Sequence, residues 1–275
     1  MKIMRFIGIV LALFLAGSPS DTSAQDSGKK YKVYMVSNSH LDTQWRWDVK
    51  ATIDDYLYNT AVQNLALLEK YPHYVFNFEG AVKYEWIKEY YPHLFERIRK
   101  FVADGRWNIS GASFEANDPN MPSSESFIRN ILLAQEFYKK EFGIKSKDMF
   151  LPDCFGFSQV MPTLGHHCGL IGFSTQKLSW RTEPLVGDSK TPFPIGLWEG
   201  VDGARIMVAL EPGRYSWNEF PEGDLSANEE LAESARKSPF GIAYRYYGNK
   251  LANGAGDHGG SALPRSIQLL EEGIT

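Results

Sequence analysis

Short apolar segments alternate with longer amphipathic segments along most of the chain. The apolar segments have the length of β-strands, and the amphipathic ones repeat their apolar residues at the spacing of an α-helix. We predict strands at residues 31–37, 74–78, 107–110, 148–151, 171–175, 196–199, 204–210 and 242–246. We predict helices at residues 54–71, 81–90, 92–104, 123–142, 225–237 and 264–272.

This alternation predicts the α/β class, with a mainly parallel sheet and helices outside it, either as an open doubly wound sheet or as a barrel. In both arrangements the functional side chains gather at the carboxyl ends of the strands. The helix at 123–142 has the clearest ends, because Ser123 or Ser124 can cap its start and Gly143 follows its last turn. Residues 181–194 are rich in Pro and Gly and predict a long loop or a hairpin.

The first residues have the pattern of a secretory signal peptide. Lys2 and Arg5 precede an apolar run at 6–17, and small residues allow cleavage after Ala24. The run is shorter than the roughly 20 apolar residues of a membrane span, and an uncleaved anchor is the alternative. We therefore expect a signal peptide at 1–24, a polar linker at 25–30 and a domain at 31–275, exported to the periplasm or secreted.

Composition excludes some classes of partner. The formal net charge of −4 provides no basic surface for nucleic acid, and once the signal peptide is removed no membrane segment is expected. Cys154 and Cys168 are too few for a disulfide scaffold, and we favour buried free thiols over a bridge. The oligomeric state is not predicted.

The triplet His40-Leu41-Asp42 follows the first predicted strand and is the first candidate for chemistry. Side chains two residues apart at the end of a strand point the same way, so the imidazole and the carboxylate can reach one cation. Imidazole with carboxylate suits Zn²⁺ or a similar ion. Trp45 adds a flat apolar surface on which a sugar ring can stack. The alternative is that these are ordinary loop residues.

Asp153 ends another apolar strand and lies among Phe150, Phe155 and Phe157. A carboxylate in such surroundings must be paired, hydrogen-bonded or protonated, and a nearby cation would keep it ionised. A metal-stabilised carboxylate can act as a nucleophile towards the anomeric carbon of a sugar. The alternative is a helix cap for a helix that starts near Ser158.

A glycine-rich loop at residues 254–260 holds Asp257 and His258. Glycines permit a tight turn and close backbone approach, so the loop can present Asp257 at the rim of a pocket. It lacks the Walker and dinucleotide signatures, and a solvated turn is the alternative. We expect His166 and His167 to interact with a helix C-terminus rather than a metal, and His73 and His93 to be surface or capping residues.

Four motifs in this order resemble glycoside hydrolase family 38, the α-mannosidases, and most of all its branch with the cytosolic mammalian enzyme and many bacterial ones. The motifs are His40-Leu41-Asp42-x-x-Trp45, Leu151-Pro152-Asp153-x-Phe155-Gly156-x-Ser158, Thr175-Gln176-Lys177-Leu178-Ser179-Trp180 and Gly254-x-Gly256-Asp257-x-Gly259-Gly260. The likeness runs from about residue 31 to the end.

The resemblance implies a seven-stranded β/α barrel-like catalytic domain and one zinc ion. Carried over to this sequence, His40, Asp42 and Asp153 match zinc ligands, and Asp153 is also the nucleophile. Trp45 and Trp180 are assigned to substrate binding, and Asp257 to the general acid/base. The implied reaction is zinc-dependent, retaining hydrolysis of terminal α-linked mannose from a glycan, which requires the two catalytic carboxyl groups to be about 5–5.5 Å apart.

The family's fourth zinc ligand is a downstream His in a His-Asp motif that would lie beyond residue 275. We therefore expect an N-terminal fragment with an incomplete domain, weak zinc binding and poor turnover. One alternative is a metal-dependent polysaccharide deacetylase, which would need an H-x-x-x-H motif that this sequence lacks. The other alternative is a secreted carbohydrate-binding remnant without turnover.

Overall fold

The structure is a computed structural model that describes residues 32–179, 195–210, 242–247 and 258–274, together with 233, 235, 236 and 238. Several predictions fall outside the described residues. These are the signal peptide at 1–24, the linker at 25–30, Trp180, the loop at 181–194, most of the helix at 225–237, and Asp257.

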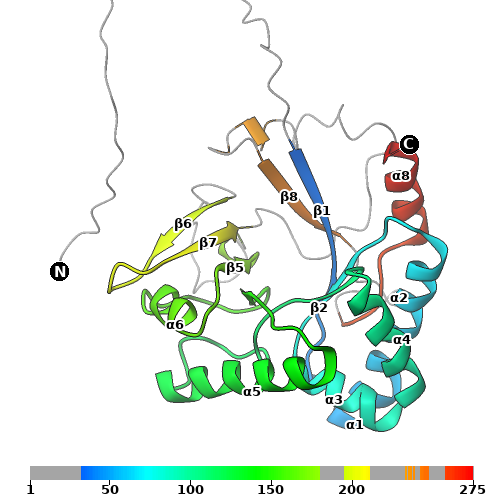
Figure 1. The fold of residues 1–275 in the computed structure, drawn as a ribbon, viewed down its shortest axis with the longest axis horizontal. Helices are drawn as coiled ribbons and strands as arrows, with labels where there is room; N and C mark the ends of the chain where they lie inside the picture. Colours follow the sequence, from blue (N-terminus) through cyan, green and yellow to red (C-terminus); the bar gives the residue numbers. More distant parts are fainter. Residues whose placement is uncertain are drawn as a thin grey trace, which may run out of the picture. The chain divides into compact units, whose positions relative to one another are not determined.

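The first sheet contains four parallel strands in the order β3-β2-β1-β8, namely β3 (Trp107–Ile109), β2 (Phe76–Phe78), β1 (Lys32–Ser39) and β8 (Ile242–Tyr247). Figure 1 shows β1 and β8 side by side. Ser39 pairs with Phe78, and Phe78 pairs with Ile109. Because this register aligns the carboxyl ends of three strands, the residues that follow them meet at one edge of the sheet.

The second sheet has the order β4-β5-β7-β6, with β4 (Asp148–Phe150), β5 (Gly172–Thr175), β7 (Arg205–Leu210) and β6 (Ile195–Glu199). The first three strands are parallel, whereas β6 pairs with β7 in antiparallel fashion at the edge. The strand after a short hairpin must reverse direction, so the β6–β7 connection accounts for this exception to the predicted parallel order.

The two sheets are joined where β3 ends and β4 begins. Ala112 N donates to the Asp148 carbonyl at 2.8 Å, and Ser110 Oγ and Gly111 N each donate to the Asp148 carboxylate at 3.2 Å. The α/β class with parallel sheets is confirmed, while the seven-stranded β/α barrel-like domain stays a prediction.

Helices cover the sheets (Figure 1). They are α1 (Val49–Ala51), α2 (Tyr58–Lys70), α3 (Ala81–Tyr90), α4 (Pro92–Ala103), α5 (Ser124–Phe142), α6 (Met161–His167) and α8 (Pro264–Ile274), with a π-helical segment at Thr52–Leu57 and a 3₁₀ turn at Lys177–Ser179. The predicted start of the first helix is residue 54, but in the structure the helix begins at Val49. Asp48 caps it by accepting from Ala51 N at 2.8 Å.

The ends of α5 agree with their prediction. Ser123 accepts from Ser126 N at 3.2 Å, and Gly143 ends the helix in the left-handed region at φ 72°. The largest buried cluster lies between the first sheet and α2, α3 and α4, and includes Phe76, Phe78 and Trp107. Cys154 and Cys168 are free thiols, as expected, but only Cys154 is buried, whereas Cys168 is partly exposed. Within the described part of the chain, no helix is both long and apolar enough to cross a membrane.

Glu271 links helix α8 to His73, which lies in the turn after α2. Its carboxylate accepts from His73 N at 2.8 Å and contacts His73 Nδ1 at 2.6 Å. Burial acts to raise the pKa of Glu271, but these two contacts and the charge of His73 outweigh it and lower the pKa. His73 is therefore a surface residue with a defined structural role.

Because the folded-state pKa of Glu271 is lowered, its contribution to stability is present above the ordinary glutamate pKa of about 4.3 and is lost as the pH falls further. We expect Glu271→Gln to lower the melting temperature at pH 7 and to have less effect at acidic pH. Glu136→Gln on the exposed face of α5 is the matched control. A Glu271→Gln difference that persists unchanged at low pH would contradict this.

Candidate active site

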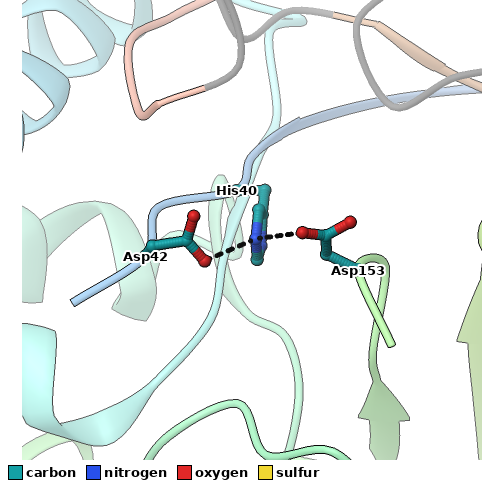
Figure 2. A group of neighbouring side chains, drawn as sticks. All are labelled: His40, Asp42 and Asp153. Atoms are coloured by element: carbon teal, nitrogen blue, oxygen red, sulfur yellow. Dashed lines mark hydrogen bonds and ion pairs between the residues drawn. The ribbon is translucent and has the colours of Figure 1, made fainter. Parts of the chain in front are cut away.

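His40 is the first residue after β1, and its imidazole lies between two carboxylates (Figure 2). Its Nε2 is 3.2 Å from Asp42 Oδ1 and 3.6 Å from Asp153 Oδ2. His40 is buried, with 3% of the residue's surface exposed. Asp42 approaches from the same loop as His40, whereas Asp153 comes from the loop after β4 in the other sheet.

Asp153 has a second charged neighbour, Lys177, in the turn that follows β5. The buried Lys177 ammonium forms an ion pair with Asp153 Oδ1, while Oδ2 faces His40. The two oxygens of this carboxylate therefore have different partners, which fixes its orientation in the site.

His40 on one side and Asp42 and Asp153 on the other shift each other's pKa values towards the charged forms. Burial acts to raise the pKa of Asp153 and of Asp42, but His40 outweighs it at both, with help from Lys177 at Asp153, and both values are lowered. Burial acts to lower the pKa of His40, but Asp153, Asp42 and Glu79 raise it well above its usual range. Both aspartates are therefore ionised at neutral pH.

The donor set fits a divalent metal ion. One donor atom each from His40, Asp42 and Asp153 lies within 4.8 Å of the others, a spacing at which one ion can reach all three. An imidazole nitrogen with two carboxylate oxygens is a combination that zinc uses in proteins. These three side chains would hold the ion.

A pocket of about 330 Å³ opens at this group, a volume within the range of small-ligand sites. Its wall combines the metal-binding group with the loop after β3. The lining includes His40, Asp42, Glu115, Asn117, Asp118 and Asp153. Four acidic side chains lie in this wall beside the apolar surfaces of Pro152 and Phe155, and so it suits a ligand that has both hydroxyl groups and apolar faces.

The end of the glycine-rich loop is attached to the same place. Gly259 N donates to the His40 carbonyl at 2.8 Å, and Gly260 N donates to Thr60 Oγ1 at 2.7 Å. The ring of His258 lies 5.3 Å from that of Trp45 and 4.6 Å from that of Trp47. The residues directly after Asp257 are thus held at the site.

Trp45 is 57% exposed and does not line the pocket at His40. The guanidinium of Arg46 covers its ring at 4.2 Å from the centroid. The rest of the indole is exposed beside the site, and its assignment to substrate binding stays a prediction.

Comparison with known proteins decides the family. Residues 30–270 match the sequence model of the glycosyl hydrolases family 38 N-terminal domain. The chain belongs to this family. Alpha-mannosidase G of Dictyostelium discoideum is 37% identical over 190 residues, which cover 69% of this chain and 17% of that protein. Mouse alpha-mannosidase 2C1 is 34% identical over 245 residues, 88% of this chain and 22% of that protein.

A solved structure supports the fold of this family 38 chain. The crystal structure of an alpha-mannosidase from Enterococcus faecalis V583 has a TM-score of 0.68 and 22% identity, covering 88% of this chain and 27% of that one. The chain thus spans about a fifth of the length of the curated relatives it matches.

Sequence reasoning missed three buried charged residues of the family 38 site: Glu79, Lys83 and Lys177. Glu79 directly follows β2, and Lys177 follows β5 within a motif that was noticed only as a whole. The rule that drew attention to His40 and Asp153, an ionisable residue at the carboxyl end of a strand, identifies both. Lys83 on α3 has no such signal, because a lysine in a helix is normally exposed.

Two alternatives for single residues are now resolved. Val160 precedes the first turn of α6, and this helix has no side-chain cap, so Asp153 does not serve as one. His166 and His167 lie in the last turn of α6, as expected for that helix end, but His167 Nε2 contacts Asp202 Oδ2 at 2.9 Å. A side chain of the β6–β7 hairpin therefore partners His167.

Gly259→Ala should detach the loop from the family 38 site. Gly259 has φ 78°, and an added Cβ would lie 2.5 Å from Thr60 Oγ1, the atom that accepts from Gly260 N. We expect a loss of about 1–3 kcal/mol in the free energy of unfolding by urea. Gly203→Ala is the matched control, because Gly203 has φ 83° with open space around it. Equal losses in both variants would show that only backbone strain matters.

Proposed function

We propose that this chain supplies the zinc-binding and nucleophile-bearing part of a retaining α-mannosidase, which removes terminal α-linked mannose from oligosaccharides or glycans. The observation that carries the proposal is the convergence of His40, Asp42 and Asp153 at one end of a pocket in a family 38 chain. The proposal includes the family's seven-stranded β/α barrel-like domain and export of the chain by a signal peptide at residues 1–24.

Asp153 is the proposed nucleophile. It is ionised, its Oδ1 is held by Lys177, and its Oδ2 faces the pocket side of His40. Attack of this carboxylate on C1 of mannose would form a glycosyl-enzyme ester and release the leaving group, and water would then hydrolyse the ester with net retention. When bound, Zn²⁺ would supply a Lewis acid that grips sugar hydroxyls.

Asp257 is the proposed general acid/base that protonates the departing oxygen and later activates water. Residues 258–260 are bound to the loop of His40 and to α2, which supports a position for their neighbour at the pocket. A retaining mechanism places the two carboxyl groups about 5–5.5 Å apart. Trp45 and Trp180 would provide apolar surfaces for sugar rings.

The alternatives have less support. A polysaccharide deacetylase would use its Asp and His residues on zinc to activate water for cleavage of an amide, and here the second carboxylate is instead paired with Lys177. A carbohydrate-binding remnant would not need an ionised, half-buried and oriented carboxylate. The curated relatives named above are alpha-mannosidases.

Covalent trapping tests the proposal without requiring complete turnover. The chain would be incubated with Zn²⁺ and an activated fluorosugar of manno configuration, digested and analysed by mass spectrometry. We expect a mannosyl label on Asp153 that disappears with chelator. The gluco-configured reagent is the control. A label on another residue, or none at saturating Zn²⁺, would overturn the proposal.

A further inference from the structure

Glu79 contacts the side of His40 that faces away from the pocket. Its Oε1 is 2.8 Å from His40 Nδ1, while His40 Nε2 faces Asp42 and Asp153. Only 2% of Glu79 and 3% of His40 are exposed, so water does not compete for this contact. An imidazole with its Nδ1 proton on a carboxylate has the Nε2 lone pair free for a metal.

Lys83 gives Glu79 a counter-charge. It lies in the first turn of α3 and is fully buried, with Nζ 3.8 Å from Glu79 Oε1 and 5.7 Å from the centre of the Phe78 ring. Neither Glu79 Oε2 nor Lys83 Nζ has a hydrogen-bond partner among the described residues. A buried pair with so few hydrogen bonds is a poor source of stability.

The backbone fixes the place of Glu79. Gly80 turns the chain after β2 at φ 85°, and a Cβ there would lie 3.2 Å from Lys83 Nζ. Ala81 N and Val82 N, at the start of α3, donate to carbonyls of the loop after β3 at 3.1 and 3.0 Å. The carboxylate is thus held at His40 before any ligand arrives.

We propose that Glu79 is a positioning residue: by holding His40 Nδ1, it directs His40 Nε2 towards the metal ion. Lys83 balances the negative charge of Glu79. This inference rests on the proposed zinc site. Glu79 would act on the metal only through His40, without touching metal or substrate. This role explains why the charges of Glu79 and Lys83 are buried at a cost in stability.

The double substitution Glu79→Leu with Lys83→Met tests the inference. It removes both charges, so the net charge near the site is unchanged, and apolar replacements of a buried pair are commonly tolerated. We expect the Zn²⁺ affinity, measured by competition with a chromophoric chelator, to fall about 10–100-fold. The melting temperature of the metal-free protein should stay the same or rise. Glu79→Gln with Lys83 intact should also lower the affinity.

Tyr84→Phe is the matched control on the same helix. It removes the hydroxyl that donates to the Phe78 carbonyl at 2.9 Å and accepts from Trp107 Nε1 at 2.9 Å, without contacting His40. This variant should lower the melting temperature and leave the Zn²⁺ affinity unchanged. If the double variant folds and binds Zn²⁺ within twofold of the wild type, the inference is wrong.

A second readout does not depend on metal binding. Long-range ¹H–¹⁵N NMR of the metal-free chain, at a pH above the raised pKa of His40 where the ring is neutral, identifies the ring nitrogen that carries the proton. His40→Gln assigns the signal. We expect Nδ1–H in the wild type and Nε2–H in the double variant. An Nε2–H wild type would overturn the inference. If the wild type shows Nδ1–H but binds no Zn²⁺, the proposed function fails and the positioning by Glu79 stands.

Discussion

Asp153→Asn should lower the Zn²⁺ affinity by at least about 100-fold, more than the loss expected when a residue behind a ligand is removed. The amide is a neutral and weaker donor, and the substitution removes half of the carboxylate charge that faces His40 Nε2. The same variant should give no covalent label with a manno-configured fluorosugar, because an amide cannot form the glycosyl ester.

Calorimetric titration of the metal-free variant with Zn²⁺, alongside a thermal melt, measures this effect. Asp202→Asn is the matched control, since Asp202 accepts from Thr163 and Ala204 and contacts His167 on an exposed part of the second sheet. That variant should bind Zn²⁺ like the wild type. A folded Asp153→Asn protein with wild-type affinity would remove Asp153 from the metal site.

Trp107→Ala should reduce the free energy of unfolding by about 3–5 kcal/mol. Trp107 is 1% exposed, packs edge-on against Phe76 at 4.8 Å between ring centroids, and donates through Nε1 to Tyr84 Oη at 2.9 Å. The substitution leaves a cavity between β3 and α3 and removes the hydrogen bond as well.

Urea unfolding of the variant and the wild type, analysed with the same m value for both, measures the loss in free energy of unfolding. Trp45→Ala is the counterpart, because its indole is mostly exposed and its removal should change stability by less than about 1 kcal/mol. If Trp45 supports substrate, that variant should instead weaken binding of a mannoside. If the free energy of unfolding of Trp107→Ala lies within about 1 kcal/mol of the wild type, the prediction is wrong, and the core has closed around the missing ring.

The strands could be predicted well because each is a short apolar run between turn residues. The observed β1 to β8 all overlap predicted segments, with ends that differ by up to two residues. The division into two sheets and the reversal of β6 could not be predicted, because strand pairing depends on contacts between residues far apart in sequence. The π-helical turn at Thr52–Leu57 has no local signature either.

At the site, the residues found from the sequence were those with unusual chemistry at strand ends. His40, Asp42 and Asp153 were identified this way, and the structure brings them together. Glu79 also follows a strand end, but it was overlooked because a lone glutamate is usually a surface residue. The burial of Lys83 becomes visible only when α3 is packed against β2.

The attachment of residues 258–260 to the start of the chain has a consequence for biosynthesis. Gly260 N and Thr60 Oγ1 are 200 positions apart, and the neighbouring Gly259 N closes on the His40 carbonyl. Such distant contacts form late, because the intervening polymer must first be ordered. A ribosome must therefore synthesise the chain at least as far as Gly260 before this corner of the pocket can close.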